Sequence, residues 1–408
     1  MIVSQSIRDS LDHCVKCTIC ETQCPVAAVT PLFPGPKYVG PQAERYRDAS
    51  REGSPDDSLD YCSGCGTCTL VCPQGVKVAE INAQARAVMK AQKGVPFRDK
   101  LISRTVVGGR LSVATSPLYN WGIGVGALRW AAERTVGIHR RAPMPHAART
   151  TFRTWVWRRN LTRRRVRSTH RVVYFHGCAA NYYETELARR TVAVLEHQGI
   201  EVIIPRQECC GLPMQSNGLL DEARASVRRL AAQLAPYARE GLDIVSTSTS
   251  CSLMLKREAR EILELEDDPD LRALAPRMFD ICEYLVGLYE QGKLQTQMQP
   301  VPLTVPYHPP CQLRAHNIGT PAHRLFELIP ELRVIDPNVT CCGVAGTYGL
   351  KAEKYDIAMA VGAPLFAQVD GSELACCDSE TCRWQINSAT GVETVHPIEL
   401  LYRAYGLE

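Results

Sequence analysis

The stretch QECCGLPMQ at residues 207–215 decides the fold, because two adjacent cysteines, Cys209 and Cys210, precede a glycine there. Neighbouring side chains on a strand point to opposite faces, so two adjacent thiols rarely serve one regular element. A loop can present both thiolates to one metal cluster, and the glycine frees the backbone to turn. The same triplet recurs in TCCGVAG at 340–346. The repeat therefore predicts two metal-binding loops, with small buried core thiols as the alternative.

Around each triplet, apolar stretches alternate with amphipathic helical patterns from residue 172 onward, as in βαβ units. Each set predicts three strands, and its cysteines follow the carboxyl ends of those strands, where loops of an open α/β sheet converge on a ligand. The second set repeats the first at offsets of 133, 132, 132 and 131 residues, which indicates a tandem duplication with domains over 172–295 and 296–408. The candidate metal ligands are Cys178, Cys209, Cys210 and Cys251 in the first set and Cys311, Cys341, Cys342 and Cys382 in the second.

Two further cysteine runs lie near the N-terminus, CVKCTICETQCP at 14–25 and CSGCGTCTLVCP at 62–73. Both have the C-x2-C-x2-C-x3-C-P spacing of ferredoxins with two 4Fe–4S clusters, in which the fourth cysteine of each run ligates the other cluster. We therefore predict one cluster on Cys14, Cys17, Cys20 and Cys72, and a second on Cys62, Cys65, Cys68 and Cys24. Zinc sites and structural thiols are the alternatives, and two complete copies argue against both.

A helical pattern, VKVAEINAQARAVMKAQKG, follows the second run and completes an expected helical ferredoxin module over residues 1–95. The expected fold class is therefore α/β, with an N-terminal α-helical ferredoxin module and a C-terminal tandem of cysteine-rich βαβ domains. The composition agrees, since 45% hydrophobic and 22% charged residues are ordinary for a globular chain of 408 residues.

The nineteen cysteines are the unusual feature of the composition. The start, MIVSQSIRDSLDHC, lacks the basic and apolar regions of a signal peptide, so we expect reduced thiols that bind metal rather than disulfides. No stretch has about 18 consecutive apolar residues, so no transmembrane helix is expected. Cys282, Cys376 and Cys377 fall outside the matched sets, and we expect them to pack in the core.

The connector, residues 96–171, has a different character. Between Arg140 and Arg171 it carries eleven arginines and no acidic residue, interleaved with aromatic residues. Since the whole chain has a net charge of +4, the basic surplus lies in this segment. The aromatic residues are Phe152, Trp155 and Trp157, and upstream lie Trp121, Leu128, Trp130 and Val136.

Aromatic and apolar residues beside arginines favour a surface helix in the lipid headgroup region, where each basic residue contributes about 1 kcal/mol with anionic lipid. A solvated linker and a nucleic-acid patch are the alternatives. Because no nucleic-acid-binding fold is recognisable, we expect an anionic lipid surface and no nucleic acid as the partner.

With these motifs, the chain resembles the iron–sulfur subunits of heterodisulfide reductases and glycolate oxidases. Within that group it is most similar to the family of C subunits of anaerobic glycerol-3-phosphate dehydrogenase. The resemblance covers nearly the whole chain and rests on HCVKCTICETQCPV, PGPKYVGPQAER, FHGCAANYY, CCGVAGTYG, GAPLF, ETCRWQI and HPIELL.

The resemblance implies a non-catalytic electron-transfer subunit. A flavin-containing dimer of A-type and B-type subunits would oxidise glycerol 3-phosphate, and this chain would pass the electrons to membrane quinone. It would also hold the complex, as a peripheral protein, at the cytoplasmic face of the membrane. The alternative is the iron–sulfur subunit of a related glycolate or lactate oxidoreductase, or of a heterodisulfide-reductase-like enzyme.

The chain departs from the family pattern at two serines. Complete cysteine-rich domains of the group end in C-x-x-C and bind a non-cubane cluster through five cysteines, but here Ser248 and Ser379 replace the first thiol of that pair. Four thiolates suffice for an ordinary cube. One or two clusters are therefore expected beyond the ferredoxin pair, and the serines argue against disulfide-reducing chemistry. Cys376 or Cys377 is the alternative source of the missing thiol near Ser379, although the spacing differs by two or three residues.

No strand followed by G-x-G-x-x-G is present, so no nicotinamide or flavin fingerprint is found. His176, beside Cys178, is a candidate for relaying a proton to reduced quinone. The alternative is that it hydrogen-bonds a cluster sulfur or the backbone. His308 is a looser equivalent in the second set.

Overall fold

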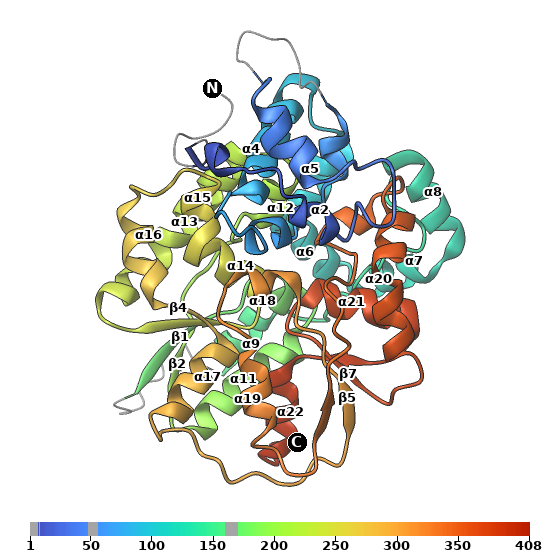
Figure 1. Cartoon of the computed structure of the whole chain (residues 1–408). Helices are drawn as coiled ribbons and strands as arrows, with labels where there is room; N and C mark the ends of the chain where they lie inside the picture. The colour runs from blue at the N-terminus through green and yellow to red at the C-terminus, as the bar shows by residue number, and fades with distance from the viewer. Residues whose placement is uncertain (1–6, 8, 48–55, 160–169) are drawn as a thin grey trace.

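Parallel strands form the centre of the C-terminal part of the chain, in one four-stranded and two two-stranded sheets (Figure 1). A computed structural model describes residues 7, 9–47, 56–159 and 170–408. The first sheet has the order β2-β1-β3-β4, with β1 at Arg171–Phe175, β2 at Glu201–Ile203, β3 at Asp243–Ser246 and β4 at Met278–Asp280.

In the second half, β5 (Thr304–Pro306) pairs with β6 (Arg333–Ile335), and β7 (Ala375–Cys376) pairs with β8 (Thr394–Val395). A parallel bridge between Tyr307 and Cys376 joins β5 to β7, so the order is β6-β5-β7-β8. This is the strand order of the first half. The structure thus confirms the α/β class and the duplication. The sequence did not predict β4 and β8, which are only three and two residues long.

Helices cover both sheets, as buried parallel strands require. Those of the first half are α10 Ala179–Tyr182, α11 Thr185–His197, α12 Leu212–Ser216, α13 Leu220–Arg239, α14 Thr249–Leu253, α15 Ala259–Glu261, α16 Pro269–Leu274 and α17 Ile281–Glu290. Those of the second are α18 Cys311–Ala315, α19 Pro321–Phe326, α20 Tyr355–Val369, α21 Glu380–Thr390 and α22 Pro397–Ala404. The halves pack reciprocally, α11 on α22 and α17 on α19, and one apolar core spans both.

The N-terminal region lies at the end of the molecule opposite the C-terminus (Figure 1). Its short elements are η1 Ser10–His13, α2 Ile19–Thr22, η2 Tyr38–Gln42, η3 Ser58–Tyr61 and α3 Thr67–Leu70. The predicted longer helix is α4, Val78–Lys93, and it ends where Gly94 takes a positive φ of 85°.

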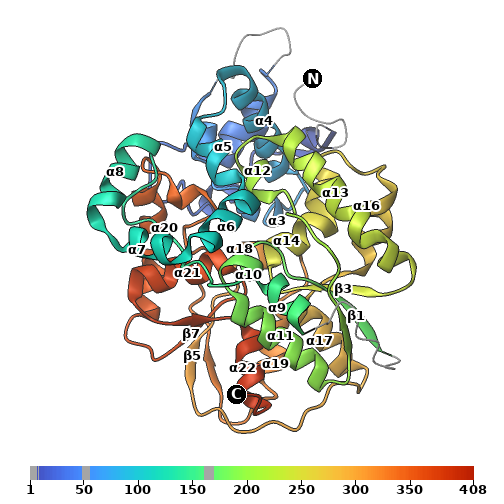
Figure 2. The same ribbon diagram turned by 180° about the vertical axis from the view of Figure 1, so that it is seen from behind.

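The connector forms α5 Phe97–Ser103, α6 Thr105–Ala114, α7 Ser116–Gly124, α8 Gly126–Val136 and α9 Phe152–Arg158. Instead of one surface helix there are two, α7 and α8, because the chain turns out of helical geometry at Val125, between two glycines. In both views these helices lie at one edge of the molecule (Figures 1 and 2).

The side chains of the connector divide between surface and core. Trp121, Trp130 and Trp157 are exposed, whereas Phe152 is fully buried and cannot belong to a surface patch. Arg163, Arg164, Arg165 and Arg167 lie outside the described residues. No helix in the described ranges is both long and apolar enough to span a bilayer.

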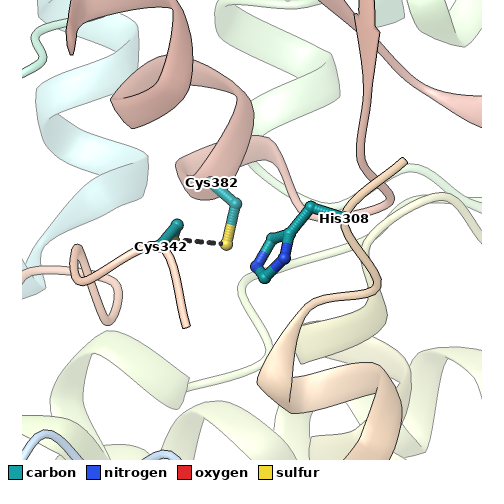
Figure 3. Close-up of side chains that lie close together, drawn as sticks. All are labelled: His308, Cys342 and Cys382. Carbon is teal, nitrogen blue, oxygen red and sulfur yellow. Dashed lines mark hydrogen bonds between the residues drawn. The ribbon is translucent and has the colours of Figure 1, made fainter. Parts of the chain in front are cut away.

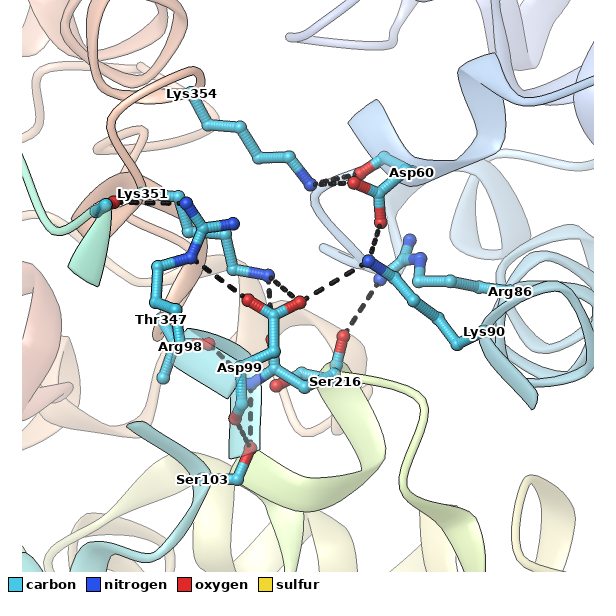
Figure 4. Close-up of polar contacts among 12 residues, drawn as sticks. Asp60, Arg86, Lys90, Arg98, Asp99, Ser103, Ser216, Thr347, Lys351 and Lys354 are labelled. Atoms are coloured by element: carbon cyan, nitrogen blue, oxygen red, sulfur yellow. Dashed lines mark hydrogen bonds and ion pairs between the residues drawn. The ribbon is translucent and has the colours of Figure 1, made fainter. Parts of the chain in front are cut away.

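Buried ion pairs tie the N-terminal region and α5 to the second half (Figure 4). Asp99, whose side chain is fully buried, lies 3.0 Å from Lys351 Nζ and 3.4 Å from Lys90 Nζ. Asp60 lies 2.9 Å from Lys90 Nζ and 2.7 Å from Lys354 Nζ. Burial alone would raise the pKa of Asp99, but Lys351 and Lys90 hold it below its ordinary value. These charges fix the N-terminal region against the cysteine-rich halves.

Candidate metal centres

The structure brings together the four cysteines that the offsets matched in the first half. We call Cys178, Cys209, Cys210 and Cys251 the first-half site. The Sγ atoms of Cys210 and Cys251 lie 3.2 Å apart. Hydrogen bonding with Cys178 and then with Cys210 lowers the pKa of Cys209, while the pKa of Cys178 is raised by the same contact and by burial. The four thiols thus form one contiguous group.

The second-half site, Cys311, Cys341, Cys342 and Cys382, repeats this arrangement. Cys342 Sγ lies 3.0 Å from Cys382 Sγ (Figure 3). Cys341 occupies the place of Cys209: hydrogen bonding with Cys311 and then Cys342 lowers its pKa. The duplication therefore extends from strand order to the contacts between individual thiols.

The glycine of each triplet has two roles. Gly211 and Gly343 have positive φ values of 83° and 86°, which a glycine adopts without strain. The same turn directs each glycine N–H back to a sulfur: Gly211 N donates to Cys209 Sγ at 3.4 Å, and Gly343 N donates to Cys341 Sγ at 3.3 Å. Backbone N–H donors to sulfur are one of the protein's means of adjusting an iron–sulfur cluster.

The N-terminal cysteines also gather as the spacing predicts. Cys14, Cys17, Cys20 and Cys72 line one small pocket and form the outer ferredoxin site. Burial raises the pKa of Cys24 to about 12, and the charges of Cys65 and Cys62 add to the shift. Cys24 therefore belongs with Cys62, Cys65 and Cys68, the inner ferredoxin site.

The inner ferredoxin site is next to the second half. Burial raises the pKa of Cys65, and the next largest cause is the charge of Cys341. The Cβ of Ala315, on α18, would lie 3.5 Å from a Cβ built at Gly66. Seven of the eight matched thiols of the two halves, together with Cys65, line one cavity of about 420 Å³.

The donor sets fit iron–sulfur clusters. All nineteen cysteines are free thiols. The four of the outer ferredoxin site surround one pocket, and seven thiols of the two halves line another together with Cys65 of the inner site. Four thiolates are the usual ligands of a 4Fe–4S cube. As individual ligands, these residues remain predictions.

The two histidines differ in their surroundings. His176 is buried, and its Nδ1 lies 2.7 Å from the carbonyl oxygen of Gly177, one of the roles considered from the sequence. Burial lowers the pKa of His176 to about 4. His308 instead faces thiols. One of its ring nitrogens and the sulfurs of Cys342 and Cys382 all lie within 4.8 Å of one another (Figure 3). Burial lowers its pKa too, although the charges of Cys382 and Cys341 oppose this.

The serines and the unmatched cysteines are accounted for in part. The Ser248 hydroxyl donates to Glu380 Oε1 at 3.1 Å, so it is engaged across the two halves. Cys282, Cys376 and Cys377 are all buried, as predicted. The spacing argued against a place for Cys377 at the second-half site, yet its thiol hydrogen-bonds with Cys382, which raises the pKa of Cys377 beyond the effect of burial.

Comparison with known proteins agrees with this architecture. Residues 10–76 match the model of a 4Fe-4S dicluster domain, and residues 172–256 and 305–387 each match that of a cysteine-rich domain. The chain is 34% identical over 400 residues to the C subunit of anaerobic glycerol-3-phosphate dehydrogenase of Escherichia coli (strain K12), covering 97% of this chain and 98% of that protein. The chain belongs to the family of these C subunits.

More distant relatives match only part of this chain. The B subunit of fumarate reductase (CoM/CoB) of Methanothermobacter marburgensis is 31% identical over 198 residues, 47% of this chain and 36% of that protein. "Lactate utilization protein A" of Geobacillus sp. is 26% identical over 188 residues, 44% of this chain and 75% of that protein.

Proposed function

We propose that this chain is the iron–sulfur electron-transfer subunit of an anaerobic glycerol-3-phosphate:quinone oxidoreductase. It receives electrons from flavin-containing A-type and B-type partner subunits and delivers them to membrane quinone. The observation that carries the proposal is the 34% identity, over nearly the full length, to a C subunit of that dehydrogenase. The thiols of the two halves and Cys65 of the inner ferredoxin site also line one cavity.

The chain's own residues give these sites an order. The outer ferredoxin site is followed by the inner one, whose Cys65 adjoins Cys341 of the second half. The first-half site adjoins the connector instead, where Thr105 Oγ1 on α6 lies 3.5 Å from Cys209 Sγ. Bound clusters would supply one-electron transfer at these sites. The order supports a path with the ferredoxin module at one end and the connector at the other.

The membrane contact, at the cytoplasmic face, belongs to the connector. Eight large apolar side chains are exposed on helices α5 to α8 of the connector, namely Phe97, Leu101, Val107, Leu111, Leu118, Trp121, Leu128 and Trp130. Scattered exposed apolar residues are common, but a group on four consecutive helices is a sign of a binding surface. Exposed arginines follow it in the chain at Arg141, Arg149, Arg158 and Arg159. Apolar side chains beside cations suit an anionic lipid surface close to the first-half site.

The function is tested by co-purifying the complex and adding glycerol 3-phosphate, lactate or glycolate without oxygen. We expect glycerol 3-phosphate alone to produce the EPR signals of reduced clusters in this chain, and a soluble quinone analogue to abolish them. Reduction by lactate or glycolate alone would favour the second candidate.

The lipid contact is tested by vesicle co-sedimentation at low salt. Replacing Leu118, Trp121, Leu128 and Trp130 with serine should release the chain from anionic vesicles. Replacing Arg158, Arg159, Arg163, Arg164 and Arg165 with glutamine should do the same. Tyr46→Ser with Ile335→Ser, at exposed positions elsewhere, is the matched control and should leave binding unchanged. Equal binding of all variants would contradict the lipid contact.

The second candidate is the iron–sulfur subunit of a lactate or glycolate oxidoreductase, or of a heterodisulfide-reductase-like enzyme. The partial matches to "Lactate utilization protein A" and to a subunit of a CoM/CoB-linked reductase favour it. Both cover less than half of this chain, so we rank it second.

A further inference from the structure

His308 has no counterpart in the first half. It lies three residues before Cys311, and three residues before Cys178 stands Phe175, whereas His176 lies only two residues before it. Successive side chains at the end of a strand point in opposite directions. The two histidines are therefore not equivalents, and this corrects the looser pairing drawn from the sequence.

Phe175 shows what the matched position does in the first half. It is fully buried and belongs to the apolar cluster that also contains Cys210 and Cys251, so the matched position carries a hydrocarbon ring. In the second half, a polar ring stands in the same place beside Cys342 and Cys382. The exchange of a benzyl for an imidazole group is a chemical difference between two otherwise matched sites.

Both ring nitrogens of His308 are buried without a hydrogen-bond partner in the described part of the chain. Buried polar atoms of this kind are rare in native proteins and call for a partner. As free thiols, Cys342 and Cys382 satisfy each other at 3.0 Å. As metal-bound thiolates they would have no proton and could only accept, and an imidazole N–H beside them is a donor.

We propose that His308 donates a ring N–H to the thiolates of the second-half site, Cys342 and Cys382, and so raises the reduction potential of that site above that of the first-half site. The proposal rests on the proposed function, since it takes clusters to be bound in both halves. Reduction places additional negative charge on a cluster and its sulfurs, so a hydrogen bond stabilises the reduced state more than the oxidised one. Phe175 gives the first-half site no such stabilisation.

The experiment is an EPR-monitored redox titration of the full-length chain, purified without oxygen and equilibrated with mediators and dithionite. Cys210→Ala removes the first-half signal and so isolates the second half, and Cys342→Ala does the converse. In the Cys210→Ala background, we expect His308→Phe to lower the midpoint potential of the second-half site by about 59 mV, the equivalent of a tenfold change in a one-electron equilibrium. His308→Asn, which keeps an N–H donor, should restore part of the shift.

The reciprocal variant is Phe175→His in the Cys342→Ala background, where the first-half potential should rise. If His308→Phe keeps its cluster at an unchanged potential, the proposal is wrong. If His308→Phe loses the cluster, the reciprocal variant decides: a rise supports the proposal, and no rise overturns it. Iron analysis of the unaltered chain separates a failure of cluster binding in the two halves from a failure of the role proposed for His308. Clusters in both halves require about sixteen irons per chain, so about twelve or fewer would refute them, whereas about sixteen irons with unshifted potentials would refute only the role of His308.

Discussion

The two cysteine-rich halves share strand order, thiol contacts and glycine turns, yet they differ in what surrounds these features. The second-half site adjoins Cys65 and has His308 beside its thiols, whereas the first-half site adjoins α6 and has Phe175. The duplicated core thus keeps the positions of the sulfurs, and the neighbouring residues distinguish the sites. A relay needs both properties, because transfer between two sites has a direction only if they differ.

The sharpest way to break this comparison is to remove one thiol from each half. Cys210→Ala and Cys342→Ala should each lose the iron of their own half, about four atoms per chain. Only Cys342→Ala should also slow reduction of the opposite half, because Cys341 of the second-half site lies beside Cys65 of the inner ferredoxin site. Iron analysis and rapid-freeze EPR measure both effects, and equal slowing by the two variants would refute the order of sites.

The glycines provide a matched pair for stability. A Cβ at Gly343 would lie 1.8 Å from the carbonyl oxygen of Ala358, whereas at Gly211 the nearest atom, Ala223 O, is at 3.0 Å. Alanine costs about 1–2 kcal/mol at either positive φ, and the overlap adds up to about 3 kcal/mol at Gly343. We expect the thermal midpoint to fall much further for Gly343→Ala than for Gly211→Ala. Similar midpoints would mean that α20 can move away from the added Cβ at little cost in stability.

The buried ion pairs attach the second half to the N-terminal region, and Asp99→Asn tests their importance. Asparagine keeps the shape but leaves Lys351 and Lys90 without their shared counter-charge, at a cost of about 3 kcal/mol. The exposed pair between Asp57 and Lys93 is the control, and Asp57→Asn should cost less than about 1 kcal/mol. Denaturant unfolding of both variants measures the free energy of unfolding. Equal decreases for the two variants would contradict a stabilising role of the buried Asp99 pairs.

The smallest effect concerns Glu258, a buried carboxyl group that lines the cavity from the first half, as Glu380 does from the second. Burial raises the pKa of Glu258 to about 7, so the native state holds its proton more tightly than the unfolded state does. That contribution to stability is present at low pH and is lost as pH rises through 7. The free energy of unfolding of Glu258→Gln should therefore rise, relative to that of the parent chain, by about 1–2 kcal/mol between pH 5.5 and pH 8. The exposed Glu222→Gln is the control, and an unchanged difference across this pH range would refute the shift.

The sequence by itself determined the features that depend on local spacing. Strands β1, β2, β3, β5, β6 and β7 precede the cysteines as expected, because apolar runs followed by turn residues are a short-range signal. The offsets matched the eight thiols, since a duplication preserves spacing. The two ferredoxin runs likewise specified which four cysteines gather in the outer ferredoxin site.

Only the tertiary structure decided which residues meet across large distances in the chain. It directed His308 rather than His176 toward thiols, buried Phe152, and engaged Ser248 with Glu380 of the other half. It also brought the Cys377 thiol to Cys382 against the expectation from spacing. The physical reason is that composition and periodicity indicate which residues are buried, whereas the partner of a buried group depends on how separate elements pack. In this protein that packing is the reciprocal contact of two halves around one cavity.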